Sequence, residues 1–336
     1  MKYREIGSEF WNIPQGDENH LFSNDTRWFI SGRAALDHIL KDIMTTKEIR
    51  TAAMPSWCCD TMIEPFLRNG IAVSFYPVII KDGRLYQDYQ DIKADVLLKM
   101  EYFGYETHND LSFAGTIISD ISHSIFTDAD HDSDYVFGSL RKWAGFKTGG
   151  FASCKEGFKI EEPTSTDSEY VGRRKKAMAL KSAYISGLSD DKGYLDIYAK
   201  AEESLAGLYD LCGDKEDIEA AKHLDLRYLK ERRRTNAKNL LAELGEYALF
   251  KEIGADDCPL FVPIIIDNRD ELRKYLIDHV IYCPIHWPIS PLHQLSEEER
   301  YLYDHELSLI CDQRYDLADI REMTAIIKQY LKEKTC

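Results

Sequence analysis

The sequence predicts an α/β protein with a large domain on a mainly parallel sheet and a small αβ domain at its C-terminal end. From about residue 30 to 155, short apolar runs alternate with helical patterns, which is typical of stacked βα units. Residues 195–245 are largely helical, and roughly the last hundred residues return to an αβ pattern. A chain of 336 residues is long enough for two domains. We therefore expect a large domain at 1–235 and a small one at 236–336, with an N-terminal segment that can pack on the small domain.

The expected elements of the large domain begin with a helix at residues 31–43. Its apolar residues recur at the spacing that places them on one helix face, namely Leu36, Ile39, Leu40 and Ile43. A second helix is predicted from Asp60, as its N-cap, to Asn69, with Gly70 ending it. Buried strands are predicted where short runs are rich in Val, Ile and Phe, at 71–76, 95–100, 116–119, 135–138 and 150–153. The polar, basic residues 160–180 indicate a loop or an interface arm.

The expected small domain follows a long helix that leaves the large domain. The buried side of that helix is formed by Leu229, Ala237, Leu240, Leu241 and Leu244. A strand at 260–266, a helix capped by Asp267 or Asn268, and a strand near Tyr282 come next. In the final helix one face is shared by Ile320, Met323, Ile327, Tyr330 and Leu331.

Composition excludes several classes of protein. With 44% hydrophobic and 30% charged residues the chain should fold throughout. A net charge of −16 repels nucleic acid and anionic lipid, so neither partner is expected. The start, Met1 to Glu5, has no signal-peptide pattern, and no apolar run reaches the roughly 18 residues that span a bilayer. We expect a cytoplasmic protein with eight reduced cysteines and no metal site, because no CxxC pair or zinc-ligand spacing occurs.

Two segments carry residues suited to binding a small anionic or aromatic ligand. Gly32 follows Ser31 at the mouth of the first helix, where backbone N–H groups can face a phosphate, although most such helix starts bind nothing. Asp120 directly follows an apolar strand, at the edge where open α/β sheets place their ligands. Its carboxylate can keep a pyridine nitrogen protonated, or it can merely cap the next turn. His123 lies beside such a ring or is an ordinary half-buried histidine.

A lysine after the next strand adds covalent chemistry. Lys142 comes three residues after Ser139 and is followed by Gly149 and Gly150. Its aromatic neighbours indicate a partly buried loop, in which an amine can form an imine with an aldehyde cofactor. Lys147 is the rival for this role.

These pieces together resemble the DegT/StrS family of sugar aminotransferases, which have the fold type I of pyridoxal-phosphate (PLP) enzymes. Ser-Gly-Arg-Ala-Ala-Leu, residues 31–36, resembles that family's Ser-Gly-Thr-Ala-Ala-Leu turn, and residues 117–124 resemble its Ile-Glu-Asp-Ala-Ala-His segment. The resemblance implies a three-layer large domain, a homodimer and bound PLP. It also implies that Asp120 pairs with the ring nitrogen, that His123 lies near the 3-oxygen, and that Lys142 forms the Schiff base. The phosphate would be bound by Gly32, Arg33, Ala34 and Ser139.

Other segments of the resemblance leave roles open. Residues 55–61 resemble the turn beside the cofactor, so that either Trp57 or Cys59 would stack on its ring. Residues 282–288 and 307–315 resemble small-domain segments near the mouth of the site, where a structural role and substrate contact are both open. Two features depart from the family. Arg33 replaces its threonine, and residues 172–187 lack its asparagine-containing loop, which a partner subunit donates.

The function implied is transfer of an amino group from an amino acid to a keto-sugar or related ketone, with a nucleotide-sugar as one candidate acceptor. One alternative is a PLP-dependent lyase or dehydratase on the same fold, because fold alone does not choose chemistry. A histidine replaces the lysine in some sugar dehydratases of the family, so the presence of Lys142 favours transamination. A second alternative is a non-catalytic binding or regulatory protein, which the two departures from the family keep open.

Overall fold

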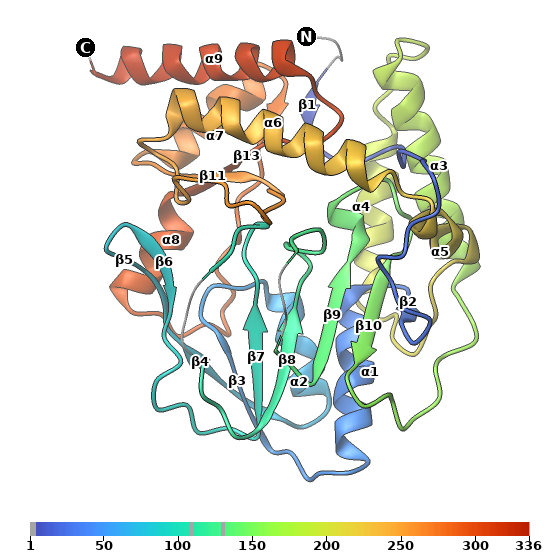
Figure 1. Cartoon of the computed structure of the whole chain (residues 1–336). Helices are drawn as coiled ribbons and strands as arrows, with labels where there is room; N and C mark the ends of the chain where they lie inside the picture. The colour runs from blue at the N-terminus through green and yellow to red at the C-terminus, as the bar shows by residue number, and fades with distance from the viewer. Residues whose placement is uncertain (1–4, 108–110, 129–131, 336) are drawn as a thin grey trace.

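The computed structural model describes residues 5–107, 111–128 and 132–335. Residues 1–4, in which no signal peptide is expected, lie outside this part. Figure 1 shows a large unit around the central sheet and a smaller unit, formed by C-terminal elements, stacked against one end of that sheet. Within the described part, no helix combines the length and the hydropathy that crossing a bilayer requires.

The central sheet has seven strands in the order β2-β10-β9-β8-β7-β3-β4. Four of its six pairings, which join β9, β8, β7, β3 and β4 in that order, are parallel. The other two join β10 to β2 and to β9 and are antiparallel. The mainly parallel sheet is therefore confirmed. Strands β7, β8 and β9 point toward the small unit, so their carboxyl ends face it (Figure 1). The bounds are β2 Arg27–Phe29, β3 Thr51–Pro55, β4 Ala72–Tyr76, β7 Val96–Met100, β8 Thr116–Asp120, β9 Tyr135–Ser139 and β10 Gly150–Cys154.

Helix α1 (Gly32–Met44) packs on β9 and β10, and the four apolar residues predicted to form its inner face are all buried. The predicted helix at 60–69 is interrupted. A 3-10 turn at Asp60–Met62 precedes α2 (Glu64–Arg68), and Asp60 caps neither segment, so that prediction is wrong. Pro65 explains the interruption, because proline lacks an N–H and disfavours helical geometry in the residue before it.

Helix α3 (Ser168–Ile185) and helix α4 (Tyr194–Leu205) form a hairpin beside the sheet (Figure 1). The expectation of a loop or arm is therefore wrong from Ser168 onward. The buried stripe of α3 includes Arg174 and Lys181, so its helical periodicity does not appear as a row of apolar residues. The connections β7–β8 and β8–β9 contain turns rather than helices in their described parts, and β5 (Val78–Lys81) pairs with β6 (Arg84–Gln87) as a hairpin.

The small unit has its own core of apolar side chains. Strand β1 (Ile6–Gly7) pairs with β12, and Ile6 lies in this core, so the N-terminal segment packs on the small unit. Along α6, Leu229 packs with Trp143 of the large unit, whereas Ala237 lies in the small-unit core. The domain division at residues 235 and 236 stays a prediction. Helix α5 (Lys215–Lys222) precedes this unit, and its Ala221 packs in a core with residues of the large unit. The later elements are α6 Leu226–Leu244, β11 Val262–Ile265, α7 Arg269–Asp278, β12 Ile281–Tyr282, α8 Glu297–His305, β13 Glu306–Leu309 and α9 Leu317–Thr335.

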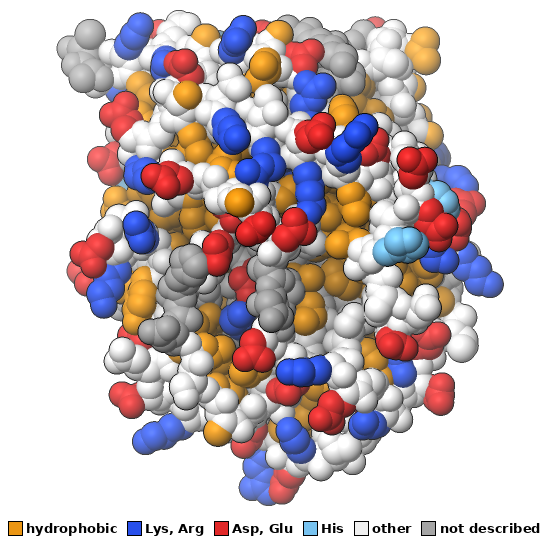
Figure 2. Space-filling model, in the orientation of Figure 1, with side chains coloured by type: hydrophobic (Ala, Val, Ile, Leu, Met, Phe, Trp, Pro, Cys, Tyr) orange, Lys and Arg blue, Asp and Glu red, His pale blue; other side chains and the backbone are white. Residues whose placement is uncertain are grey.

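The start of α7 and the surface of the molecule each add one detail. Asn268, one of the two residues predicted to cap α7, is its N-cap residue, but it has φ of 56° and its side chain makes no capping hydrogen bond. Over the face drawn in Figure 2, side chains of both charges are interspersed, with apolar side chains between them. Charge of one sign does not dominate that face.

Candidate active site

The centre of the candidate site is a contact between a lysine and a histidine. Lys142 ends a short 3-10 turn directly after β9, and His123 follows β8 by three residues. Their side chains meet with 2.9 Å between Lys142 Nζ and His123 Nε2. Because β8 and β9 are neighbouring parallel strands, their carboxyl ends bring both residues to the same edge of the sheet.

His123 is fully buried and surrounded by aromatic rings. Phe103, His286 and Trp287 have ring centroids 4.9, 5.2 and 5.5 Å from it. Burial lowers the pKa of His123 well below its ordinary value, and the charge of Lys142 acts in the same direction. His123 is therefore neutral at physiological pH. Its Nδ1 is buried and has no hydrogen-bond partner within the described residues.

Asp120 lies at the end of β8 and is 3% exposed. Its Oδ1 accepts a hydrogen bond from the backbone N–H of Ser122 at 2.7 Å, so it does cap the following turn. Burial raises the pKa of Asp120, and the positive charge of Lys142 opposes that rise. The capping contact and the electrostatic contact with Lys142 coexist, so the capping interpretation does not exclude the functional one.

The start of α1 and the end of β9 form a small polar cradle. Ser31 Oγ accepts the N–H of Ala34 at 3.2 Å, whereas the N–H groups of Gly32 and Arg33 lie in the first turn and have no intrahelical acceptor. A Cβ added to Gly32 would lie 3.5 Å from Ser139 Cβ, which places Ser139 across from this turn. Of the three residues predicted at the helix start, Gly32 and Arg33 thus offer backbone donors, and Ala34 does not.

Two arginines flank this cradle. The predicted departure, Arg33, places its Nη1 3.0 Å from Glu64 Oε2, and its buried Nε has no hydrogen-bond partner in the described part of the chain. Arg141 precedes Lys142 and pairs with Glu202 at 2.5 Å. Positive charge is therefore concentrated beside the helix start, and part of it is neutralised by carboxylates.

The two candidates for ring stacking differ in accessibility. Trp57 is completely buried, and Tyr102 covers one of its faces at a centroid distance of 5.1 Å and an interplanar angle of 16°. Cys59 is partly exposed. Burial raises the pKa of the Cys59 thiol, and the charge of nearby Lys142 opposes that rise. Of the two, only Cys59 keeps some exposed surface.

The rival lysine is bound elsewhere. Lys147 Nζ lies 2.8 Å from both Asp214 and Glu216 and 3.4 Å from Asp217. Burial alone would lower the pKa of Lys147, but the hydrogen bonds to Asp214 and Glu216 outweigh it and raise the pKa. An amine held as a charged ammonium is a poor nucleophile. This arrangement favours Lys142 for covalent chemistry.

Two residues of the site come from the small unit, where the sequence left their role open. The ring of Trp287 is stacked on His123 with an interplanar angle of 25°, and its centroid is 5.9 Å from Lys142 Nζ. His286 is held by a hydrogen bond of 2.9 Å between its Nδ1 and Ser308 Oγ. Two aromatic residues between Pro284 and Pro288 were the signal for them.

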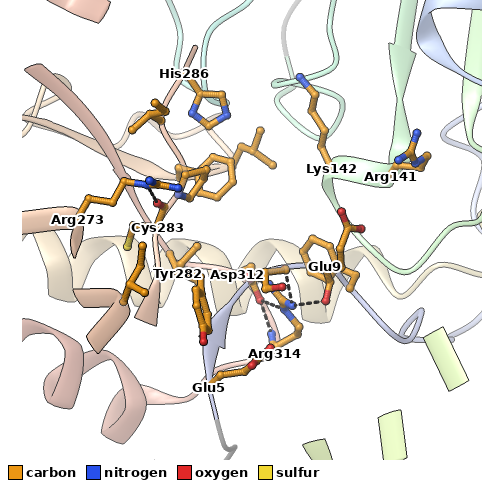
Figure 3. A pocket seen from close by; sticks show the side chains of 18 of the residues that line it. Glu5, Glu9, Arg141, Lys142, Arg273, Tyr282, Cys283, His286, Asp312 and Arg314 are labelled. Carbon is orange, nitrogen blue, oxygen red and sulfur yellow. Dashed lines mark hydrogen bonds and ion pairs between the residues drawn. The ribbon is translucent and has the colours of Figure 1, made fainter. Parts of the chain in front are cut away.

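A cavity of about 500 Å³ opens beside Lys142, between the two units. Its walls come from the N-terminal segment, from Arg141 and Lys142, and from the small unit, which contributes Arg273 (Figure 3). Arg273 is one of several lining residues that sequence reasoning missed, because an arginine on a charged helix carries no local signal.

Solved structures of the same fold cover nearly the whole chain. The sugar aminotransferase CalS13 from Micromonospora echinospora is 15% identical with a TM-score of 0.61, over 91% of this chain and 87% of that one. A DegT DnrJ EryC1 StrS aminotransferase from Brucella abortus is 15% identical with a TM-score of 0.58, over 93% and 86%. The PLP form of Spr1654 from Streptococcus pneumoniae, described as a sugar aminotransferase, is 14% identical with a TM-score of 0.60, over 90% and 87%. No protein-family model and no curated protein sequence matches the chain.

These likenesses establish the fold. The chain has the fold type I of PLP-dependent transferases, and in particular the arrangement found in sugar aminotransferases of the DegT/StrS type. The fold that residues 31–36 and 117–124 predicted is thereby confirmed.

Proposed function

We propose that this chain is a PLP-dependent aminotransferase that uses Lys142 to bind the cofactor covalently. The observation that carries the proposal is the position of the Lys142 amine, 2.9 Å from a neutral buried histidine. It lies at the carboxyl edge of the sheet, in a fold shared with solved sugar aminotransferases, one of them in a PLP form.

The residues present fit the chemical groups of PLP. The N–H groups of Gly32 and Arg33, together with the Ser139 hydroxyl, offer donors for a phosphate. Asp120 offers a buried carboxylate for a ring nitrogen, and the unpartnered Nδ1 of His123 offers a contact for the 3-oxygen. PLP supplies, when bound, an aldehyde for the amine and a ring that withdraws electrons from the substrate's α-carbon.

The remaining steps belong to side chains of this chain. The Lys142 amine would take up and return the proton of the substrate's α-carbon as general base and acid. Asp120 would hold the ring nitrogen in its protonated form. His123 would orient the Lys142 amine, and Trp287 would cover this pair from the small unit and exclude water.

The substrates proposed are an amino-acid donor and a keto-sugar or related ketone as acceptor. A nucleotide-sugar is one candidate acceptor, and a homodimer is the proposed assembly. These proposals rest on the fold and on the names of its solved examples.

The test is borohydride reduction of the purified protein after addition of PLP, followed by peptide mapping. We expect the absorption band of a lysine-bound cofactor in the native chain and the reduced adduct on the Lys142 peptide. Lys142→Ala should abolish both. Lys147→Ala is the matched control and should leave both intact, because Lys147 is bound by three carboxylates.

Three outcomes would count against the proposal. An adduct on the Lys147 peptide would transfer the role to Lys147, and absence of any adduct in the native chain would remove the cofactor. An adduct without amino transfer from any amino acid to a keto-sugar would leave the lyase or the non-catalytic alternative. Amino transfer in two half-reactions, with Lys142→Ala inactive in both, is the expected result.

A further inference from the structure

A histidine on the small-unit wall of the cavity is backed by a buried carboxylate. His286 lines the cavity, and its Nδ1 lies 2.9 Å from Ser308 Oγ. The Ser308 hydroxyl donates in turn to Glu306 Oε1 at 2.5 Å, and Glu306 Oε2 accepts the backbone N–H of His286 at 2.7 Å. Ser308 and Glu306 lie on β13 and are completely buried. These three side chains form a hydrogen-bonded relay from the interior of the small unit to the cavity.

Glu306 is a buried carboxylate with one basic partner. Among the described residues, that partner is His286, with 3.9 Å between its Nδ1 and Glu306 Oε1. The guanidinium of Arg269 lies nearby, but it donates to the backbone carbonyl of Glu306. A buried carboxylate is costly unless a neighbouring group can compensate its charge. The group placed to do so here is the imidazole of His286, when it takes up a proton.

The direction of the hydrogen bonds determines the tautomer of His286. Because Ser308 donates its proton to Glu306, its oxygen accepts at the other contact, so His286 Nδ1 carries the ring proton. Burial lowers the pKa of His286, Lys142 acts in the same direction, and Glu306 opposes both. His286 is therefore neutral at neutral pH, and Nε2 has the free lone pair.

The ring of His286 lies beside the Lys142 amine. It meets the ring of His123 edge-on, with 5.2 Å between the centroids, and His123 contacts the Lys142 amine. Figure 3 shows His286 and the Lys142 amine at the same end of the cavity. Lys142 belongs to the large unit and His286 to the small one. A substrate between them therefore meets two groups that can move protons.

We propose that His286 is a catalytic residue that moves protons between nitrogen and oxygen at the acceptor's carbonyl carbon, with Ser308 and Glu306 as its positioning residues. When an amino group replaces that oxygen, the carbon–oxygen bond breaks, a carbon–nitrogen double bond forms, and the oxygen leaves as water with two protons from the nitrogen. His286 Nε2 takes these protons one at a time and gives each to the oxygen, so the imidazole ends neutral, as it began.

The relay supports both parts of each transfer. It keeps the lone pair of His286 on Nε2, and the charge of Glu306 stabilises the imidazolium that exists between uptake and release of the proton. The same transfers run in reverse when water releases a keto product from the amino donor. The inference rests on the proposed function, because it assigns a step of the same reaction.

The relay is tested first on the full chain without PLP, by NMR of isotope-labelled histidine rings. With His286→Gln to assign the signals, we expect a protonated Nδ1 and an unprotonated Nε2 at neutral pH. Ser308→Ala should release the tautomer and lower the pKa of His286, because the hydrogen-bonded link to Glu306 is lost. A protonated Nε2 in the native chain, or a pKa that Ser308→Ala leaves unchanged, would overturn the inference.

Two rates then separate His286 from Lys142 in the PLP-loaded protein, with the most active donor among L-glutamate, L-glutamine and L-alanine. Exchange of the donor's α-proton for solvent deuterium needs Lys142 but no carbonyl step, so His286→Gln should retain it. The single-turnover rate of keto-product formation should fall about a hundredfold or more, the loss typical of a proton-transfer group. Ser308→Ala keeps the imidazole and should slow the same step by a smaller factor.

The control is His279→Gln, which removes a histidine at the end of α7, outside the residues that line the cavity, and should leave both rates unchanged. A keto-product rate in His286→Gln within about threefold of the native rate would overturn the inference. An equal loss of α-proton exchange would do the same, because His286 would then serve the whole site and not the carbonyl step. If the native chain exchanges the α-proton of no donor, the proposed function itself fails.

Discussion

The N-terminal segment forms one wall of the cavity, and a buried ion pair holds it there. Glu5 is 2% exposed and pairs with Lys181, whose side chain is 0% exposed, and with Lys192, whose side chain is 34% exposed. Replacement of Glu5 by Gln keeps the shape of the side chain and removes the charge that faces Lys181. We expect this change to destabilise the fold and to loosen strand β1.

The magnitude follows from the state of Lys181. Burial lowers the pKa of Lys181 from 10.5 to about 8, Arg314 acts in the same direction, and Glu5 opposes both. Holding Lys181 charged at neutral pH thus already costs about 3 kcal/mol. Removing one partner of a buried pair typically costs about 3–5 kcal/mol. In Glu5→Gln, however, Lys181 can lose its proton at neutral pH, only about one pKa unit below its folded value of about 8, and this limits the cost. We therefore expect Glu5→Gln to lower the free energy of unfolding by about 1–2 kcal/mol at neutral pH.

The pH dependence has a definite sign. Between the folded pKa of Lys181, about 8, and its unfolded value of 10.5, the unfolded state binds more protons, so stability rises with pH in this window. Without Glu5 the folded pKa falls further, because an opposing charge is gone. The deficit of Glu5→Gln relative to the native chain should therefore shrink as Lys181 loses its proton, toward about pH 10.

Urea denaturation of both chains, at neutral pH and at about pH 9.5, measures these differences. Lys192→Gln is the matched control, because it removes the half-exposed partner of Glu5 and should cost about 1 kcal/mol or less. A deficit in Glu5→Gln below about 1 kcal/mol, or one that does not change with pH, would refute the reasoning.

Two further predictions concern other buried groups. Burial and Arg27 lower the pKa of His38 from 6.5 to about 4, so the unfolded state binds the extra proton as the pH falls through this range and stability is lost. Because His38→Gln lacks this titration, its free energy of unfolding should fall by about 2–3 kcal/mol less than that of the native chain between neutral pH and about pH 4.5, as measured by urea denaturation. An equal fall in the two chains would contradict this prediction. Asp120→Asn should slow amino transfer about a hundredfold or more, because a neutral amide no longer holds the ring nitrogen protonated. Single-turnover rates measure this, and a rate within threefold or so of the native chain would reject the role of Asp120.

Local signals were sufficient for most of the large domain. Helix α1 was predicted from the spacing of its apolar residues, which depends on residues within a few positions of one another. The same holds for the strands that precede Asp120 and Ser139. Because ligands of parallel sheets bind where strands end, the positions of Asp120 and Lys142 followed from the strands.

Contacts between distant segments account for the errors and omissions. Helix α3 was missed because the charged residues Arg174 and Lys181 lie on its buried side. Their acidic partners, Glu9 and Glu5, lie far away in the sequence, near the N-terminus. Trp287 reaches His123 only because the small unit docks on the large one. No short window of sequence contains either relation.

The same long-range ion pairs, which no short window of sequence shows, also decide which cations of the cavity are neutralised. Arg314, held by Asp312, lies 3.9 Å from the ring of Phe10 and donates to the backbone carbonyl of Ser8 at 3.1 Å, so it fixes the N-terminal wall. Two of the ion pairs near this wall, Arg314 with Asp312 and Lys192 with Glu5, also neutralise a cation that lines the cavity. Among the described residues that line the cavity, Lys142, Arg233 and Arg273 are the cations without a carboxylate partner, and Lys142 and Arg273 lie on opposite sides of it (Figure 3). The ion pairs of the N-terminal wall therefore reduce the positive charge of the cavity without removing it.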